Sequence, residues 1–252
     1  FLFIFFLQVL FFIYAALKKT DKVTDLSYGL TFVLASSFAY VLNMEYGSLF
    51  KIILLFLVSL WGIRLSAYLF VRILKTGKDK RFDGIREDFK KFGSFWLLQS
   101  ISIFIILLPL TYIFFSHEDM ELNWVSYLGL LIFVCGILLE SFADYQKFIF
   151  KNNEENKGKW INIGLWEYSR HPNYLGEIMV WVGIFIYCLV YINDIAILTI
   201  LSPIYISILL LGVSGVPTLE KEYDRRYGGD KEYIEYKRKT GILFPKIIYR
   251  EK

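Results

Sequence analysis

Long apolar runs, separated by short polar and charged segments, organise the chain from its first residues onward. A helix on the surface of a soluble domain carries polar residues every few positions, and these runs lack that interruption. A helix that crosses a bilayer needs roughly 20 mostly apolar residues, within a range of about 17 to 25. Seven runs meet or approach this length: 1–17, 26–44, 49–74, 95–115, 124–150, 173–192 and 195–216. The pattern predicts an all-α, polytopic membrane protein with seven transmembrane helices in a single domain, residues 1–252.

The ends of the chain differ from this pattern. The first run begins with Phe1 rather than Met and is short at that edge, as trimming of preceding residues would produce. The sixth and seventh runs are separated only by an Asn and an Asp, which predicts a tight helical hairpin. The tail, 217–252, is no longer apolar, and its segment 219–238 has helical spacing with many charges. We expect an interfacial helix there that ends near Thr240 and Gly241.

The charged residues are segregated from the apolar runs. Hydrophobic residues make up 56% of the chain, yet 21% of its residues are charged. Of the 28 Lys and Arg residues, 26 fall in four connecting or terminal segments: 18–25, 72–93, 147–172 and 217–252. Because positive charge that flanks a span resists translocation, these four segments are expected on the cytosolic side. The distribution predicts an N-terminus outside and a cytosolic C-terminus.

Several classes of function lack their sequence signatures. There is no basic stripe interleaved with exposed aromatic residues, so we expect membrane lipids and no nucleic acid as partners. The chain has no Walker loop, no G-x-G-x-x-G after a strand, no H-E-x-x-H and no G-x-S-x-G. His117 and His171 are its only histidines, and Cys135 and Cys188 lie inside apolar runs. No metal site is therefore expected.

The densest polar cluster that borders a span is 164–177, Gly-Leu-Trp-Glu-Tyr-Ser-Arg-His-Pro-Asn-Tyr-Leu-Gly-Glu. Ser169 is a candidate N-cap and Pro172 is tolerated in a first helical turn, so the sixth span is expected to begin here. Asn173 and Glu177 then share one helix face. A carboxylate as deep as Glu177 is costly in a membrane unless it faces a polar cavity or a partner, which indicates a functional site.

Two interpretations of this cluster stand side by side. In the structural one, Arg170 and His171 anchor the chain at the interface and Glu177 belongs to an ion pair. In the functional one, the helix N-terminus and Arg170 form a phosphate or carboxylate site, which the neighbouring Tyr174 would help to line. The density of polar groups in this short segment favours the functional interpretation.

Other spans carry polar groups of their own. Arg64, Tyr68 and Arg72 recur every four residues, so one face of the third span presents Arg, Tyr and Arg. Asp144 lies in the last turns of the fifth span. Both features also suit ordinary interfacial side chains, since Lys and Arg reach the membrane surface readily. Further candidates in the inner loop and on the tail are Arg81, Glu220, Tyr223, Tyr233 and Tyr236.

Five motifs follow one another along the second half of the chain. They are the cluster at 164–177, Trp181, the run Ser-Gly-Val-Pro-Thr-Leu-Glu at 214–220, Tyr233-x-x-Tyr236 and the Phe-Pro at 244–245. Together they resemble the steroid 5-alpha-reductase-like superfamily, above all its largely bacterial branch, which is related to isoprenylcysteine carboxyl methyltransferase and sterol reductase folds. The excess of Ile, Lys and Phe is also typical of AT-rich bacterial genomes. We expect a bacterial inner membrane, or the endoplasmic reticulum in a eukaryote.

This resemblance implies a seven-helix membrane reductase that binds NADPH from the cytosolic side. Such an enzyme reduces a carbon–carbon double bond conjugated to a carbonyl in a hydrophobic substrate of the steroid, isoprenoid or lipid class. Inner-side Arg, Asn, Asp and Tyr residues hold the cofactor in such a family, and fixed positive charge with N–H donors suits its phosphates. The expected cofactor residues are Arg64, Arg72, Arg81, Asp144, Arg170, His171, Asn173, Tyr174, Glu177, Trp181, Glu220, Tyr223, Tyr233 and Tyr236.

The substrate half departs from the family pattern. Steroid reductases carry a Gln-Glu pair on the second span and a Tyr on the third, which polarise the substrate carbonyl. This chain has Asp25, Tyr28 and Tyr68 in roughly those regions. A Tyr hydroxyl can donate to a developing enolate with a nearby acid in support, so these three residues are the catalytic candidates.

Two other classes of function stay open. An S-adenosylmethionine-dependent methyltransferase of the isoprenylcysteine or phospholipid type would also carry an Arg-His-Pro-x-Tyr motif and a Glu-rich C-terminal helix. The Asn-Tyr-Leu-Gly-Glu continuation at 173–177 and the run at 214–220 favour the reductase. A non-catalytic lipid-binding protein would instead pack its polar residues against each other.

Overall fold

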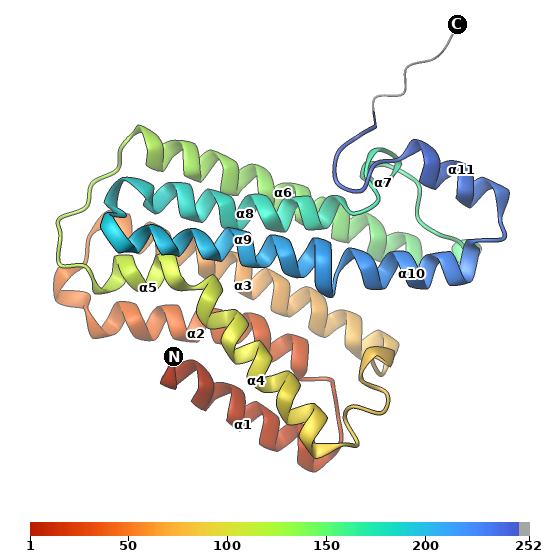
Figure 1. Ribbon diagram of the computed structural model, residues 1–252, viewed down its shortest axis with the longest axis horizontal. Helices are drawn as coiled ribbons and strands as arrows, with labels where there is room; N and C mark the ends of the chain where they lie inside the picture. Colours follow the sequence, from red (N-terminus) through yellow and green to blue (C-terminus); the bar gives the residue numbers. More distant parts are fainter. Residues whose placement is uncertain (247–252) are drawn as a thin grey trace, which may run out of the picture. The chain divides into compact units, whose positions relative to one another are not determined.

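The computed structural model describes residues 1–246, apart from the side chain of Lys80, and its described residues form helices without strands (Figure 1). The first five α-helices are α1 (Leu2–Lys18), α2 (Thr24–Leu42), α3 (Leu49–Thr76), α4 (Phe89–Ile106) and α5 (Leu108–Phe115). The others are α6 (Trp124–Asn152), α7 (Leu165–Tyr168), α8 (Pro172–Cys188), α9 (Leu201–Ile208), α10 (Val216–Tyr227) and α11 (Lys231–Lys239). Shorter helical turns are η1 (Met44–Tyr46), η2 (Lys80–Phe82), η3 (Glu154–Asn156), η4 (Leu189–Tyr191), η5 (Asp194–Ile200) and the π-helical η6 (Leu209–Val213).

Six helical segments among the described residues are long and apolar enough to cross a membrane. They are Thr24–Leu42, Leu49–Thr76, Phe89–Ile106, Trp124–Asn152, Pro172–Tyr191 and Asp194–Tyr227. These segments confirm an all-α polytopic membrane protein. α1 is apolar but only 17 residues long, so the seventh span stays a prediction, as does the orientation of the termini.

Two predicted helices are each divided in the structure. The expected span at 95–115 breaks at Leu107, because Pro109 lacks the N–H that would continue α4. At the buried end of α4, the Ser202 hydroxyl donates a hydrogen bond to the Ile106 carbonyl at 2.6 Å. The expected tail helix at 219–238 is interrupted after Tyr227 by two glycines, and α11 then begins anew.

The chain folds as two compact units. Unit 1 consists of Phe1–Tyr127 and Tyr187–Ser202. Its helices α2 and α3 approach closely where Gly29 faces Gly62, and a Cβ on Gly29 would meet the Gly62 carbonyl oxygen at 2.6 Å. Such small residues let helices approach in a membrane, where packing and hydrogen bonds drive their association.

A buried polar cluster also joins α1, α2 and α4 in unit 1. The Gln99 side-chain amide donates to Gln8 Oε1 at 2.9 Å, and the Gln8 amide donates to Thr31 Oγ1 at 2.7 Å. All three side chains are buried, so their polar groups are satisfied by each other rather than by water. The cluster ties these helices together in a specific register.

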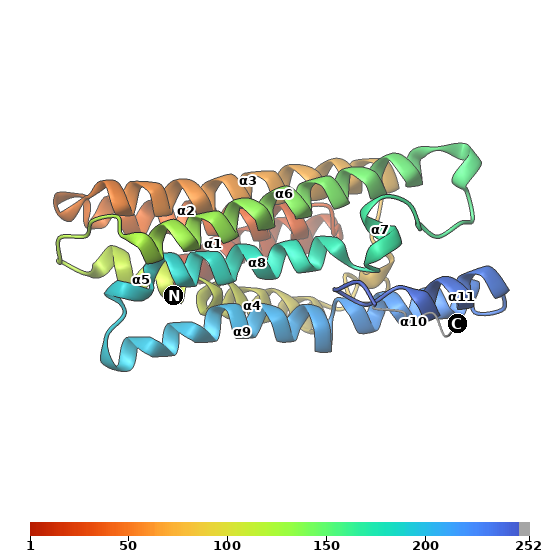
Figure 2. The same cartoon turned by 90° about the horizontal axis from the view of Figure 1, so that it is seen from above.

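Unit 2 consists of Leu128–Ile186 and the chain from Pro203 onward. α6 and α8 run side by side in it, as both views show (Figure 2). The helices are in backbone contact, because a Cβ on Gly176 would lie 2.6 Å from the Glu140 amide nitrogen and 2.7 Å from the Gly136 carbonyl oxygen. The start of α8 is thereby placed against the polar end of α6.

Candidate functional site

Glu220 lies at the centre of an ionic network in unit 2. Its Oε1 accepts hydrogen bonds from Arg170 Nε and His171 Nε2, each at 3.0 Å, and its Oε2 lies 3.1 Å from Lys237 Nζ. Lys237 also contacts Asp224 at 2.6 Å. Two cations and two carboxylates therefore compensate each other at the junction of α8, α10 and α11.

Arg170 fastens the tail to the start of α8. Its Nη1 donates to the carbonyl oxygens of Thr240 at 2.7 Å and Lys237 at 2.9 Å, and its main-chain N–H donates to Gly241. Among the described residues, its Nη2 makes no hydrogen bond, so one edge of the guanidinium remains available. The structural interpretation thus accounts for most hydrogen bonds of the Arg170 side chain. The predicted contact of Arg170 with a phosphate stays a prediction.

The expectation that Ser169 caps the sixth span is wrong. α8 begins at Pro172, which does occupy its first position. The Ser169 hydroxyl instead donates to the Ile242 carbonyl at 3.0 Å, and Ser169 forms an isolated parallel bridge with Gly241. The residues before α8 are therefore held by the chain after α11.

His171 is buried and has an unusual set of contacts. Burial lowers its pKa below the usual value, although its hydrogen bond to Glu220 acts in the opposite direction. A neutral ring that donates from Nε2 to Glu220 has an unprotonated Nδ1. That atom is buried and has no hydrogen-bond partner among the described residues. The ring stacks on Tyr174, with centroids 5.4 Å apart.

The polar groups of α6 and α8 face each other at the same level. Asn173 donates from Nδ2 to Asp144 Oδ1 at 3.2 Å, and the Asn173 Oδ1 is buried without a hydrogen bond to any described residue. Glu140 lies one turn before Asp144 on α6 and is 2% exposed. Glu177 follows Asn173 by one turn on α8 and is half-buried, while Trp181, a turn later, is fully buried.

The tail tyrosines have mainly structural contacts. Tyr233 donates to Asp224 at 3.0 Å and Tyr236 donates to the Trp166 carbonyl at 2.7 Å. Burial raises the pKa of both phenols, so they stay protonated and serve as donors. Tyr223 is half-buried, with its ring 5.9 Å from that of Tyr227.

The remaining predicted residues belong to unit 1. Arg72 contacts Asp25 at 3.0 Å, and Arg81 contacts Asp79 at 2.6 Å and Asp25 at 3.4 Å. The catalytic candidate Asp25 therefore lies between two guanidinium groups. Tyr28, on α2, packs edge-on against Phe32.

Arg64 and Tyr68 are half-buried on α3, one helical turn apart. Unit 1 thus gathers Asp25, Arg72 and Arg81 at the α2–α3 end, whereas unit 2 gathers the residues around Arg170 and Asn173. Sequence reasoning missed Glu140, Asp224 and Lys237. Glu140 had a visible signal, since it is a carboxylate inside an apolar run, but the other two looked like ordinary surface charges.

The fold and these contacts define a polytopic helical membrane protein with a buried polar site at the base of one helix. The family model described as "Protein of unknown function (DUF1295)" matches residues 11–240, so the chain belongs to this family. No solved structure matches the chain.

Two curated relatives match part of the chain. The steroid 5-alpha-reductase DET2 of Gossypium hirsutum is 41% identical over 69 residues, which are 27% of this chain and 27% of that protein. The steroid 5-alpha-reductase DET2 of Solanum lycopersicum is 38% identical over 69 residues, 27% of this chain and 26% of that protein. The chain thus spans about a quarter of the length of the curated relatives it matches. The resemblance to the steroid 5-alpha-reductase-like superfamily is confirmed.

Proposed function

We propose that the protein is an NADPH-dependent membrane reductase. Its substrate would be a steroid-like, isoprenoid or other lipid molecule with a carbon–carbon double bond conjugated to a carbonyl. The family match over residues 11–240 and the partial identity to steroid 5-alpha-reductases support this proposal. The active protein would sit in a membrane, which the six long apolar helices favour.

The observation that carries the proposal is the pair of buried acceptors His171 Nδ1 and Asn173 Oδ1. A buried acceptor without a donor is costly, so such atoms are often completed by a ligand or by water. NADPH carries suitable donors in its ribose hydroxyl groups and its carboxamide. Arg170 offers Nη2 nearby in the sequence, and Asp144 orients Asn173 by accepting from its amide.

When bound, NADPH supplies the hydride for the double bond. The residues that would hold it in unit 2 are His171, Asn173, Tyr174 and Glu177, with Arg170 toward a phosphate. Tyr68 or Tyr28 would donate a hydrogen bond to the substrate carbonyl oxygen as negative charge develops there. Asp25, which contacts both Arg72 and Arg81, would hold these two guanidinium groups in place.

A thermal-shift experiment on the purified protein in detergent tests the cofactor. A ligand that binds the folded state raises its melting temperature, and at a concentration 100 times its Kd it adds about 2.7 kcal/mol of stability. We expect NADPH or NADP+ to raise the midpoint of the wild type. Asn173→Ala and Glu177→Ala should abolish the shift, whereas the exposed-site controls Asn162→Ala and Glu167→Ala should retain it.

The alternatives give different results in the same experiment. If S-adenosylmethionine raises the melting temperature and neither NADPH nor NADP+ does, the methyltransferase interpretation replaces the reductase interpretation. No shift with any of these ligands would leave a non-catalytic lipid-binding protein. Activity is then measured as NADPH oxidation in the presence of a lipid enone. The variants Tyr68→Phe and Tyr28→Phe show which of the two Tyr hydroxyl groups contributes to this activity.

A further inference from the structure

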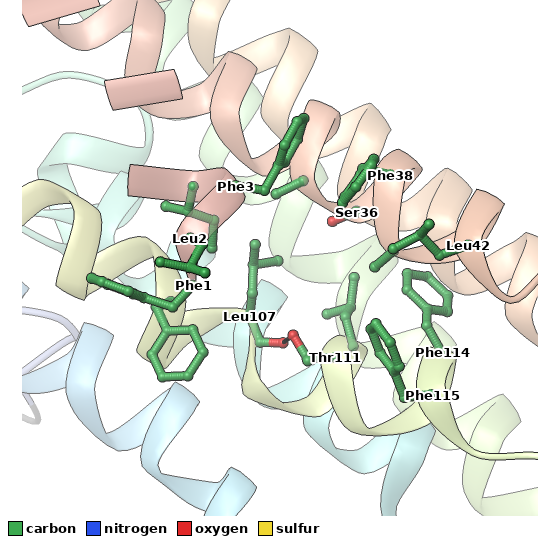
Figure 3. A pocket seen from close by; sticks show the side chains of 15 residues that line it. Phe1, Leu2, Phe3, Ser36, Phe38, Leu42, Leu107, Thr111, Phe114 and Phe115 are labelled. Atoms are coloured by element: carbon green, nitrogen blue, oxygen red, sulfur yellow. Dashed lines mark hydrogen bonds between the residues drawn. The ribbon is translucent and has the colours of Figure 1, made fainter. Parts of the chain in front are cut away.

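Unit 1 contains a cavity of about 270 Å³ that the cofactor proposal does not use (Figure 3). Its walls come from the first turn of α1, the second half of α2, the end of α4 and α5. Phenylalanine, leucine and alanine side chains make most of this lining, and no charged side chain of the described residues belongs to it. The two polar exceptions are Ser36 and Thr111.

The sequence explains why space remains here. Ala35, Ser36 and Ala39 place three small side chains along the α2 wall of the cavity. On the opposite wall, the break at Leu107 ends α4 and α5 restarts in a new direction with Pro109 in its first turn. The bend and the small residues together leave the cavity unfilled.

Ser36 is the exceptional polar group of this cavity. Its hydroxyl is buried and has no hydrogen-bond partner among the described residues. Every other buried serine in the described part of the chain donates to a main-chain carbonyl: Ser27, Ser66, Ser100, Ser102, Ser126, Ser169 and Ser202. Thr111, on the facing wall, is likewise satisfied by the Leu107 carbonyl at 3.0 Å.

A buried hydroxyl without a partner is unfavourable, since it has lost its hydrogen bonds to water. In Figure 3 the Ser36 side chain lies among the apolar residues that line the cavity. A ligand with one hydrogen-bonding group and an otherwise apolar surface would suit this cavity. Its polar group would pair with the Ser36 hydroxyl, and its apolar part would contact the apolar lining. A fully apolar ligand would leave Ser36 unsatisfied.

We propose that this cavity binds a neutral aliphatic lipid that carries one hydroxyl or carbonyl group, with that group hydrogen-bonded to Ser36. An apolar cavity of about 150 Å³ accommodates benzene, so the present volume suits a chain of roughly ten carbon atoms. We expect the lipid to enter from the membrane, because α2 and α4, which form two of the walls, are apolar enough to span it.

The cavity is separate from the catalytic candidates of the proposed reductase. Ser36 follows Tyr28 by eight residues on α2, which places it about 12 Å further along the helix axis. The inference therefore does not depend on the cofactor, and it holds for a reductase, a methyltransferase or a non-catalytic protein alike.

The test uses a photoreactive analogue of 1-decanol with a diazirine in its chain, added to the full chain in phosphatidylcholine nanodiscs. After irradiation, labelled peptides are identified by mass spectrometry. We expect label on the first turn of α1, the second half of α2 and α5, and we expect unlabelled 1-decanol to compete for it. Decane should compete about three- to tenfold less well, as expected for the loss of one hydrogen bond.

Two variants and a matched control complete the experiment. Ser36→Ala should weaken competition by 1-decanol about three- to tenfold and make it equal to that of decane. Ala39→Phe should remove the label by filling the cavity. Ser37→Ala, a neighbouring serine outside the lining, should behave as the wild type.

The proposal fails if decane competes as well as 1-decanol against the wild type, since the cavity then takes any membrane chain. It also fails if the label spreads evenly over the membrane-facing residues of all helices. Because Ser36→Ala removes only one oxygen atom, it keeps the test decisive even if Ala39→Phe does not fold.

Discussion

The Nε atom of Arg170 lies 3.0 Å from Oε1 of Glu220, and the side chains are 9% and 14% exposed. Removal of one partner from a buried ion pair leaves an uncompensated charge, which is strongly destabilising. Glu220→Ala should therefore lower the free energy of unfolding by about 3 kcal/mol, because Arg170 and Lys237 both lose their shared carboxylate. Denaturant unfolding of the purified protein in detergent measures the change.

Glu222, a half-buried carboxylate on the same helix whose partner Arg225 is 74% exposed, provides the control. Glu222 pairs with Arg225 at 2.7 Å, but exposed pairs of this kind contribute only about 0 to 1 kcal/mol. If Glu222→Ala costs as much stability as Glu220→Ala, the network around Glu220 is not what holds the tail against α8.

Stability should also depend on pH through His171. Burial lowers the pKa of this ring below its ordinary value of 6.5, so the unfolded chain binds the proton more readily than the folded one. The contribution of the neutral ring is fully present above pH 6.5 and is lost as the pH falls toward the lowered pKa. Unfolding measured between pH 5 and pH 8 should show stability falling on the acid side.

The groups around His171 set the size of this effect. Glu220 favours the protonated ring, whereas Arg170 and Lys147 disfavour it, and burial outweighs them all. His171→Gln should flatten the acid side of the profile, whereas replacement of the exposed His117 by Gln should leave it unchanged. An identical slope in the wild type and His171→Gln would show that other groups cause the acid loss.

Much of the fold can be predicted from the sequence because apolar length is a local property. The run at 49–74 became α3, Leu49–Thr76, and the run at 124–150 became α6, Trp124–Asn152, each within two residues at either end. The break at Leu107 was missed because the apolar run continues through it, although Pro109 was a visible signal.

The candidate site was predictable only in part, since its contacts join distant segments. The cluster at 164–177 marked the start of α8 correctly, yet the partner of Arg170 is Glu220, 50 positions later. Many carboxylates in the tail were equally plausible from the sequence. Tertiary packing decides which of them reaches Arg170, and no local pattern records that choice.

The contact between α6 and α8 predicts an effect of a single methyl group. A Cβ on Gly176 would meet the Glu140 amide nitrogen at 2.6 Å and the Gly136 carbonyl oxygen at 2.7 Å. Gly176→Ala should therefore push the helices apart and cost about 1 to 3 kcal/mol, the usual range for overpacking. The variant should also weaken the binding of any ligand that requires Asn173 and Asp144 to face each other.

Gly212 is the matched control, because a Cβ there would meet no described atom within 4 Å. Gly212→Ala should be neutral or slightly stabilising, by about 0.4 to 1 kcal/mol. Thermal unfolding of both variants compares them directly. Equal midpoints for the two would mean that α6 and α8 accommodate the methyl group by sliding past each other.

Unit 1 has a buried ion pair of its own, in which Arg86 Nη1 contacts Asp21 Oδ1 at 2.6 Å with side chains 8% and 2% exposed. Asp21 also accepts the main-chain N–H of Asp79, so the pair holds the α3–α4 connection against the α1–α2 connection. A double-mutant cycle with Asp21→Asn and Arg86→Met measures their coupling, which we expect to be about 1 to 3 kcal/mol.

The exposed pair of Lys78 and Asp83 is the control for this cycle, and it should give a coupling below about 1 kcal/mol. Because Asp79 also contacts Arg72 and Arg81, loss of Arg86 should disturb the surroundings of Asp25 as well. A coupling near zero between Asp21 and Arg86 would mean that the loop keeps its conformation without the ion pair.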